Sequence, residues 1–226
     1  MKVSGIILAG GGSTRYGTGE NKTLAMLCGR PVLEYSLRVF LGSPAVDEVV
    51  LAARAGEEAT LRALAESLSP EKPVTVVTGG KDRAESVQNA LTAAKGERVL
   101  IHDGARPLVT KELLEDCLAA LTQADGAAVA VASPDTVKLA DVDGYVERST
   151  DRSRTYLIQT PQAFYREELL KLHRALTERE GITDDCMLLE RAGRRVKLVP
   201  GRRENIKITT PADRELAEFY LKKGTE

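Results

Sequence analysis

Short runs of apolar, largely β-branched residues alternate with longer stretches in which apolar residues recur every three or four positions. The short runs predict strands that are buried on both faces, at 3–8, 46–53, 74–78, 98–102 and 126–132. The longer stretches predict amphipathic helices, around 31–41, 56–68, 83–95 and 111–123. This alternation is typical of a mostly parallel sheet with helices on both faces. We therefore expect a Rossmann-like α/β fold, in which ligands bind beyond the carboxyl ends of the strands.

The pattern changes at 133–151, where "VKLA" and "YVERS" flank the turn sequence "DVDG". Two short strand-like segments around a tight turn of this kind predict a β-hairpin. A two-stranded projection is marginal alone in water and needs another surface to pack on. We interpret 133–151 as a protruding dimerisation arm within a single domain that spans residues 1–226.

Composition and charge narrow the classes of partner. The 226 residues are 42% hydrophobic and 29% charged, which is ordinary for a globular protein. Because 32 Lys and Arg residues nearly balance 33 Asp and Glu residues, the net charge indicates neither a nucleic-acid partner nor a membrane partner. We see no apolar stretch of about 20 residues that would span a membrane and no signal peptide, so we expect a cytoplasmic protein.

The few cysteines and histidines argue against several kinds of site. Cys28, Cys117 and Cys186 are widely spaced and odd in number, which disfavours a disulfide framework and a structural zinc site. With two histidines in the chain, a His-rich metal centre is excluded. Cys117 lies in "LLEDCLAAL" at core spacing, so we expect a buried thiol rather than a nucleophile.

A glycine-rich segment follows the first predicted strand. Residues 8–22 read "LAGGGSTRYGTGENK" and contain five glycines together with Arg15 and Lys22. Glycines at this density allow the backbone to approach a ligand closely, and backbone N–H groups with two cations suit a polyphosphate. The alternative interpretation is a solvent loop with incidental cations.

Two common phosphate-binding patterns do not match this segment. The dinucleotide pattern G-x-G-x-x-G requires a third glycine where the chain has Arg15, and the second predicted strand ends without an acidic residue for a ribose hydroxyl. A Walker A loop requires glycine at Asn21, before Lys22. A nicotinamide oxidoreductase and a P-loop kinase are therefore disfavoured. A nucleotide-binding regulatory module without chemistry stays open as an alternative from another class.

Six segments together resemble the 2-C-methyl-D-erythritol 4-phosphate cytidylyltransferase family of the non-mevalonate isoprenoid pathway. They cover the chain from end to end and read "LAGGGSTRYGTGENK", "GGKDRAESVQNAL" (79–91), "IHDGARP" (101–107), "DRSRTYLIQTPQAF" (151–164), "GITDD" (181–185) and "GRRENIKITTPADRELAEFYL" (201–221). Ribitol-5-phosphate cytidylyltransferases share most of these motifs and are the second candidate.

The resemblance implies a nucleotidyltransferase that moves CMP from CTP to 2-C-methyl-D-erythritol 4-phosphate. The acceptor phosphate would attack the α-phosphorus in line and expel pyrophosphate, giving 4-diphosphocytidyl-2-C-methyl-D-erythritol. This chemistry depends on positioning and electrostatic stabilisation, and no general base is required because the attacking phosphate is already ionised. The resemblance also implies a homodimer with shared active sites.

The resemblance assigns roles to residues of this chain. The catalytic cations would be Arg15, Lys22 and Lys207. The nucleotide-binding residues would be Ala9, Gly10, Gly11, Gly80, Lys81, Ser86 and Gly104. The acceptor would be held by Thr136, Arg152, Thr160 and Thr183, of which Thr136 and Arg152 would come from the partner's arm. Each threonine, taken alone, is more often a cap or a strand residue, and "TDD" at 183–185 is typical of a helix N-cap.

Asp103 is the expected metal ligand, because a carboxylate at a strand end can join phosphate oxygens around Mg²⁺ or another divalent cation. An Asx turn before Pro107 is the alternative role for this residue. We expect His102 to be a packed, hydrogen-bonded histidine, Arg106 to pin its loop by a salt bridge, and Arg83 to order the neighbouring loop.

The chain departs from the usual family pattern at three positions. Lys81 stands where aspartate is common, Asn21 where proline is common, and Glu204 where the motif often has aspartate. A base contact through the backbone of residue 81 would survive the change. We expect Asn21 to loosen the glycine-rich loop, and the extra methylene of Glu204 to alter any contact with metal or Lys207.

Overall fold

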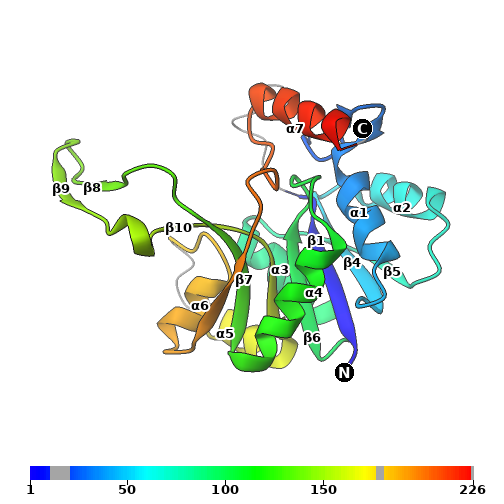
Figure 1. Cartoon of the computed structure of the whole chain (residues 1–226). Coiled ribbons are helices and arrows are strands. Elements are labelled where there is room, and N and C mark those ends of the chain that lie inside the picture. Colours follow the sequence, from blue (N-terminus) through cyan, green and yellow to red (C-terminus); the bar gives the residue numbers. More distant parts are fainter. Residues whose placement is uncertain (11–20, 177–180, 225–226) are drawn as a thin grey trace.

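The computed structural model describes residues 1–10, 21–176 and 181–224 (Figure 1). Its central sheet has the strand order β11-β7-β10-β6-β1-β4-β5. These strands are β1 (Val3–Leu8), β4 (Glu48–Ala53), β5 (Val74–Thr78), β6 (Arg98–Asp103), β7 (Gly126–Ala132), β10 (Tyr156–Tyr165) and β11 (Val196–Pro200). Strand β10 runs antiparallel to both of its neighbours, whereas the other pairings in this sheet are parallel.

Helices cover both faces of the sheet. The described residues form the helices α1 (Val32–Gly42), α2 (Glu58–Ser67), α3 (Arg83–Ala93), α4 (Lys111–Ala120), α5 (Arg166–Ala175), α6 (Cys186–Arg191) and α7 (Pro211–Lys223), of which the first six cover the sheet. Helices α1, α2 and α4 contribute to one buried apolar cluster, and α3, α5 and α6 contribute to a second. These findings confirm the predicted α/β fold with a mostly parallel sheet between helical layers.

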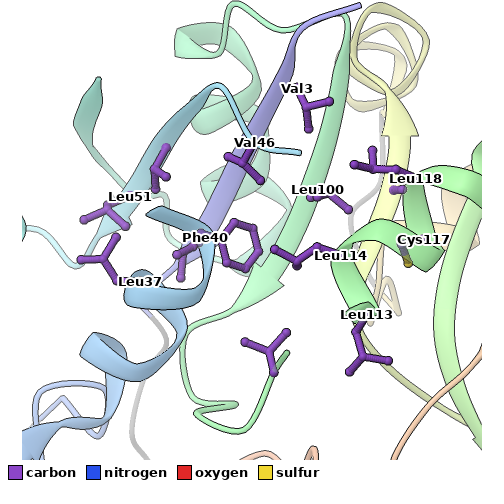
Figure 2. Close-up of a cluster of buried hydrophobic side chains, with 14 of the residues drawn as sticks. Val3, Leu37, Phe40, Val46, Leu51, Leu100, Leu113, Leu114, Cys117 and Leu118 are labelled. Atoms are coloured by element: carbon purple, nitrogen blue, oxygen red, sulfur yellow. The ribbon is translucent and has the colours of Figure 1, made fainter. Parts of the chain in front are cut away.

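The first cluster shows why the apolar spacing of the sequence produces these helices. In Figure 2, Leu37 and Phe40 of α1 and Leu113, Leu114 and Cys117 of α4 lie among the side chains of the core. Residues three and four positions apart share one face of a helix, so each helix buries a single apolar stripe. Cys117 donates its S–H to the Pro161 carbonyl at 3.3 Å, and burial raises the pKa of its thiol to about 12. The prediction of a buried thiol is confirmed.

A small accessory layer lies over one end of the sheet. The short strands β2 (Met26–Leu27) and β3 (Arg30–Pro31) form an antiparallel pair, and α7 packs against this pair through a third cluster that includes Leu27 and Ala217. Thr210 begins α7 with a reciprocal capping box to Asp213, which satisfies two N–H groups of the helix start. This layer was not predicted from the sequence.

The predicted hairpin is present and projects from the body of the protein (Figure 1). Strands β8 (Lys138–Ala140) and β9 (Val146–Ser149) pair antiparallel, and the Asp141 carboxylate accepts hydrogen bonds from the N–H groups of Asp143 and Tyr145 in the turn. Large apolar side chains are exposed around this hairpin, including Val142, Tyr145 and Val146. Across the described residues, no helix combines the length and apolar character needed to cross a membrane.

Candidate active site

Two adjoining pockets lie at the carboxyl ends of the central strands. The first has a volume of about 260 Å³. The predicted residues that line it are Gly10, Lys22, Gly80, Lys81, Ser86, Asp103 and Lys207. The second has a volume of about 310 Å³ and contains the predicted residues Thr160 and Thr183. Arg83, Asp103 and Lys207 line both pockets, so these three residues form a shared wall.

Asp103 ends strand β6 among three cationic side chains. Its Oδ2 lies 2.7 Å from Lys207 Nζ and 3.9 Å from Arg106 Nε, and its Oδ1 lies 3.6 Å from Arg83 Nε. Burial alone would raise the pKa of this carboxyl, but the charges of Arg83, Lys207 and Arg106 outweigh burial and hold the pKa well below its usual range. The Asp103 side chain is therefore ionised at neutral pH.

A buried hydrogen-bond network fixes the backbone behind Asp103. The Thr160 hydroxyl accepts the Asp103 N–H at 3.0 Å and lies 3.0 Å from His102 Nδ1. His102 Nε2 lies 3.1 Å from the Arg106 carbonyl, so the neutral ring donates from Nε2 and accepts the Thr160 hydroxyl proton at Nδ1. Burial lowers the pKa of His102 to about 4. The prediction of a packed, hydrogen-bonded histidine is confirmed.

Lys207 reaches Asp103 from the loop that connects β11 to α7. This loop has no regular secondary structure and crosses the ends of the strands. Asn205 is buried in this loop and donates from Nδ2 to the Thr160 carbonyl at 2.9 Å. The Ile208 N–H donates to the Ala105 carbonyl at 2.8 Å, and Arg106 donates to the Asn205 carbonyl at 2.8 Å. Hydrogen bonds on both sides of Lys207 thus hold its backbone. The predicted salt bridge of Arg106 within its own loop is present as well, because its Nε lies 3.9 Å from Asp103 Oδ2.

The start of helix α3 forms one side of the first pocket. The Asp82 side chain caps the helix by accepting the Glu85 N–H at 2.7 Å. The Ser86 hydroxyl accepts the Gly80 N–H at 3.0 Å and donates to the Asp82 carbonyl at 2.8 Å. A Cβ at Gly80 would lie 2.2 Å from Glu85 Cγ, so the close approach of this loop to the helix requires a glycine. Lys81 is exposed beside it.

Asn21 occupies the position before Lys22 and joins the two ends of the glycine-rich segment. Its Nδ2 donates to the Ala9 carbonyl at 2.7 Å and to Glu57 Oε2 at 2.5 Å. Its Oδ1 accepts the N–H and the hydroxyl of Thr23 at 3.0 and 2.8 Å. Asn21 therefore anchors the backbone beside Lys22. Residues 11–20 of the glycine-rich loop, where loosening was expected, lie outside the described residues.

Several predicted residues lie away from the two pockets or outside the described residues. Ala9 is buried and donates its N–H to the Ala52 carbonyl at 2.9 Å. Gly104 is buried where a Cβ would lie 2.9 Å from the Leu8 carbonyl oxygen, so its role in the structure is close packing. Thr136 and Arg152 are exposed beside the hairpin, and neither lines these pockets. Gly11 and Arg15 lie outside the described residues.

Comparison with known proteins identifies the family of this site. A family model described as 2-C-methyl-D-erythritol 4-phosphate cytidylyltransferase matches residues 3–223. The chain belongs to this family. The match confirms the resemblance seen in the six motifs, and it favours this cytidylyltransferase family over the ribitol phosphate enzymes and over a module without chemistry.

Individual members of the cytidylyltransferase family align along almost the whole chain. The protein of that name from Caldanaerobacter subterraneus subsp. tengcongensis is 42% identical over 228 residues, which covers 99% of this chain and 100% of the relative. The one from Clostridium acetobutylicum is 39% identical and covers 97% of each chain. The crystal structure of 4-diphosphocytidyl-2C-methyl-D-erythritol synthase from Anaerococcus prevotii is similar, with a TM-score of 0.87 at 34% identity, covering 98% of this chain and 96% of that one.

The sequence analysis did not predict two of the pocket residues of this cytidylyltransferase family member as site residues. Arg83 was expected to order a loop, yet it lines both pockets. Gln162 was not singled out, although it is buried, lines the second pocket, and has no hydrogen-bond partner for its amide among the described residues. The signal was present for both, because Arg83 and Gln162 lie inside the motifs "GGKDRAESVQNAL" and "TPQAF".

The cap of helix α6 differs in detail from the sequence interpretation. The Asp184 carboxylate accepts the Met187 N–H at 3.1 Å, so Asp184 supplies the capping bond. The Thr183 hydroxyl lies 3.3 Å from the Met187 sulfur. Because a thioether is a weak hydrogen-bond acceptor, this hydroxyl can turn to a hydrogen-bonding group of a bound ligand at little cost.

Proposed function

We propose that the chain transfers the cytidylyl group of CTP to 2-C-methyl-D-erythritol 4-phosphate, with release of pyrophosphate. Family membership supports this assignment, and so does the shape of the site. The observation that carries it is the shared wall of Arg83, Asp103 and Lys207 between two adjoining pockets. A transferase must bring two polyanions together at one phosphorus, and this wall faces both binding spaces.

The residues of the wall suit the chemistry of in-line phosphoryl transfer. Negative charge accumulates on the equatorial oxygens of the α-phosphate as the acceptor phosphate attacks and pyrophosphate leaves. Lys22 and Lys207 bring positive charge to the first pocket, and Arg106 brings it to the second. Preorganised cations of this kind stabilise the transition state without reorganising during the reaction. His102 has both ring nitrogens engaged inside the protein, which agrees with a reaction that needs no general base.

A divalent cation such as Mg²⁺ fits this site through Asp103. In the described part of the chain, no group of three or more His, Cys, Asp or Glu side chains is arranged to hold an ion, so phosphate oxygens and water must complete its coordination, as Mg²⁺ prefers. Asp103 lines both pockets, and its Oδ1 lies 3.6 Å from Arg83 Nε, beyond hydrogen-bond distance, so this hard oxygen would be the one to bind the ion. When bound, the ion neutralises charge on the triphosphate and helps to orient it.

The acceptor is assigned to the second pocket and to an arm from a second subunit. Thr160 contributes there by holding the Asp103 backbone, and Thr183 by offering its hydroxyl. Thr136 and Arg152 lie beside the exposed hairpin and would enter the partner's site in a two-fold homodimer, the most common oligomeric arrangement. This dimer and the role of 133–151 as its arm are proposals, as is the cytoplasmic location expected from the sequence.

Pyrophosphate release provides the test of this function. We expect release with CTP and methylerythritol 4-phosphate when Mg²⁺ is present, and loss of turnover in excess chelator. Turnover with ribitol 5-phosphate alone would reassign the acceptor. Binding of CTP at equilibrium without turnover of either acceptor would favour a regulatory nucleotide-binding module.

A further inference from the structure

Arg83 lies between two carboxylates, one in the proposed site and one behind it. Its Nη1 lies 2.7 Å from Asp185 Oδ2, whereas its Nε lies 3.6 Å from Asp103 Oδ1. The first distance is that of a charge-assisted hydrogen bond, and the second is too long for one. Arg83 therefore makes its strong contact with Asp185, although Asp103 is close enough to compete for the same guanidinium.

Asp185 is held from the other side by His173. The Asp185 side chain is buried at the start of α6, and its Oδ1 lies 3.0 Å from Nε2 of His173 on α5. Burial alone would raise the pKa of Asp185, but the charge of Arg83 and the hydrogen bond from His173 outweigh it, so the net pKa is lowered. A buried carboxylate with a partner on each oxygen is fixed in place. The apolar packing of α5 and α6 in the second cluster supports both partners.

We propose that Asp185, with His173 behind it, is a positioning residue that holds Arg83 short of a direct hydrogen bond to Asp103. Asp103 then keeps its 2.7 Å contact with Lys207 through Oδ2, while its Oδ1 stays without a direct hydrogen bond to Arg83. The inference rests on the transferase activity proposed above and extends it to residues that touch neither substrate.

The expected consequence of losing Asp185 follows from the charges that remain. Arg83 is largely buried, so without Asp185 its guanidinium needs another carboxylate as counter-charge. The Asp184 carboxylate is engaged in capping α6, which leaves Asp103 as the closest alternative. A guanidinium that turns to Asp103 can form a two-point contact and compete with Lys207 for the same oxygens. The chemical step would suffer, because it depends on the placement of Asp103 and Lys207, while the nucleotide pocket would keep its other contacts.

The test is a double-mutant cycle between Asp185→Asn and Arg83→Met, with kcat expressed per folded enzyme. We expect Asp185→Asn to lower kcat by tenfold to a hundredfold, in the range caused by small misplacements of reacting groups, and to change KM for CTP by less than about threefold. In the Arg83→Met background, Asp185→Asn should have no further effect, since a residue that acts through another is not additive with it. Glu190→Gln, an exposed carboxylate on the same helix, is the matched control and should behave as wild type.

Thermal unfolding of every variant separates positioning from stability. If Asp185→Asn does not fold, kcat is compared among wild type and two other variants. Asp185→Glu keeps the charge, and the Arg83→Met/Asp185→Asn double variant removes both buried charges. Recovery of most of kcat by Asp185→Glu supports the proposal. Effects that multiply in the double variant, or a kcat for folded Asp185→Asn within twofold of wild type, would overturn it. A wild-type protein without transferase activity would instead overturn the proposed function.

Discussion

Lys207 Nζ and Asp103 Oδ2 lie 2.7 Å apart although their residues are separated by 104 positions in the chain. This ion pair ties the loop before α7 to the end of β6, across the boundary of the two pockets. It also means that Lys207, which lines both pockets, already has a carboxylate partner before substrates bind. A triphosphate or a metal ion entering the site must share Lys207 or Asp103 with the existing pair.

Asp103→Asn tests the role of that carboxylate. The substitution keeps the shape of the side chain but leaves Lys207, Arg83 and Arg106 without their common counter-charge. We expect kcat to fall by at least about 100-fold, as for the loss of an electrostatic component of a site, while CTP binding without added metal is retained or strengthened. Steady-state kinetics and calorimetric titration measure the two effects. A kcat within a few-fold of wild type would show that Asp103 is not needed for chemistry, and the exposed Asp116→Asn on α4 serves as the control.

Local patterns predicted the α-helices and the sheet strands of the first 132 residues, apart from the short pair β2 and β3, because each has an apolar stripe or run of its own. Strand β10 reads "YLIQTPQAFY", in which Gln, Thr, Pro and Gln interrupt the apolar residues. Its place between β6 and β7 is set by pairing with strands that precede it by tens of residues. No spacing rule specifies such an insertion or its antiparallel direction.

The same limit applies to the candidate site. Asp103, Lys22 and Lys207 stand inside recognisable motifs, so the sequence identified them. The contacts of Arg83 with Asp185 and of Asn21 with Glu57 join residues 102 and 36 positions apart. The partners of Arg83 and Asn21 are set by tertiary packing. The sequence therefore predicted which residues lie at the site better than it predicted the contacts that hold each side chain in place.

Lys22→Ala tests the interpretation of the glycine-rich segment. Lys22 lines the first pocket, and a cation that stabilises developing charge on the phosphate should lower kcat by about 100-fold or more when it is removed. Circular dichroism and thermal unfolding should match wild type. Near-normal rates at saturating CTP would favour a solvent loop with an incidental cation. Lys171→Ala, an exposed lysine on α5, controls for the loss of one positive charge.

Asn21→Ala tests the anchor beside Lys22. The variant loses the hydrogen bonds from Asn21 to the Ala9 carbonyl and to Glu57, as well as the acceptor for Thr23. We expect kcat/KM for CTP to fall by about tenfold, which corresponds to about 1.4 kcal/mol and lies within the range for hydrogen bonds that involve a charged group. Glu57→Gln keeps an acceptor for Asn21 Nδ2 and should cost less. Equal values for wild type and Asn21→Ala would mean that the anchor does not place Lys22.

The buried His102 predicts a loss of stability in mild acid. Its pKa in the folded protein is lowered to about 4, from 6.5 for an exposed histidine, so the unfolded chain takes up this proton at a higher pH than the folded chain does. The unfolded state therefore binds more protons between these values, and stability falls as the pH falls through this window. We expect His102 to account for about 2 kcal/mol of the loss between pH 7 and pH 5.

His102→Asn provides the comparison, because the Asn amide oxygen can still accept the Thr160 hydroxyl proton and the residue does not titrate. Urea unfolding at pH 7 and pH 5 gives the free energy of unfolding for both proteins. We expect a smaller difference between the two pH values in the variant, whatever its absolute stability. An equal pH dependence in the two proteins would assign the acid sensitivity to other groups.

Arg152 lies just beyond the hairpin and is exposed, away from both pockets of its own chain. If each arm completes the partner's site, Arg152→Ala and Lys22→Ala homodimers should both be nearly inactive. A mixed dimer would place both lesions in one site and leave the other site intact. Co-refolding of equal amounts with random pairing makes half of the dimers mixed, so about a quarter of wild-type activity should return under the two-fold model. Inactive parents whose verified mixed dimers recover no activity would instead place Arg152 in the site of its own chain, and the model of shared sites would be wrong.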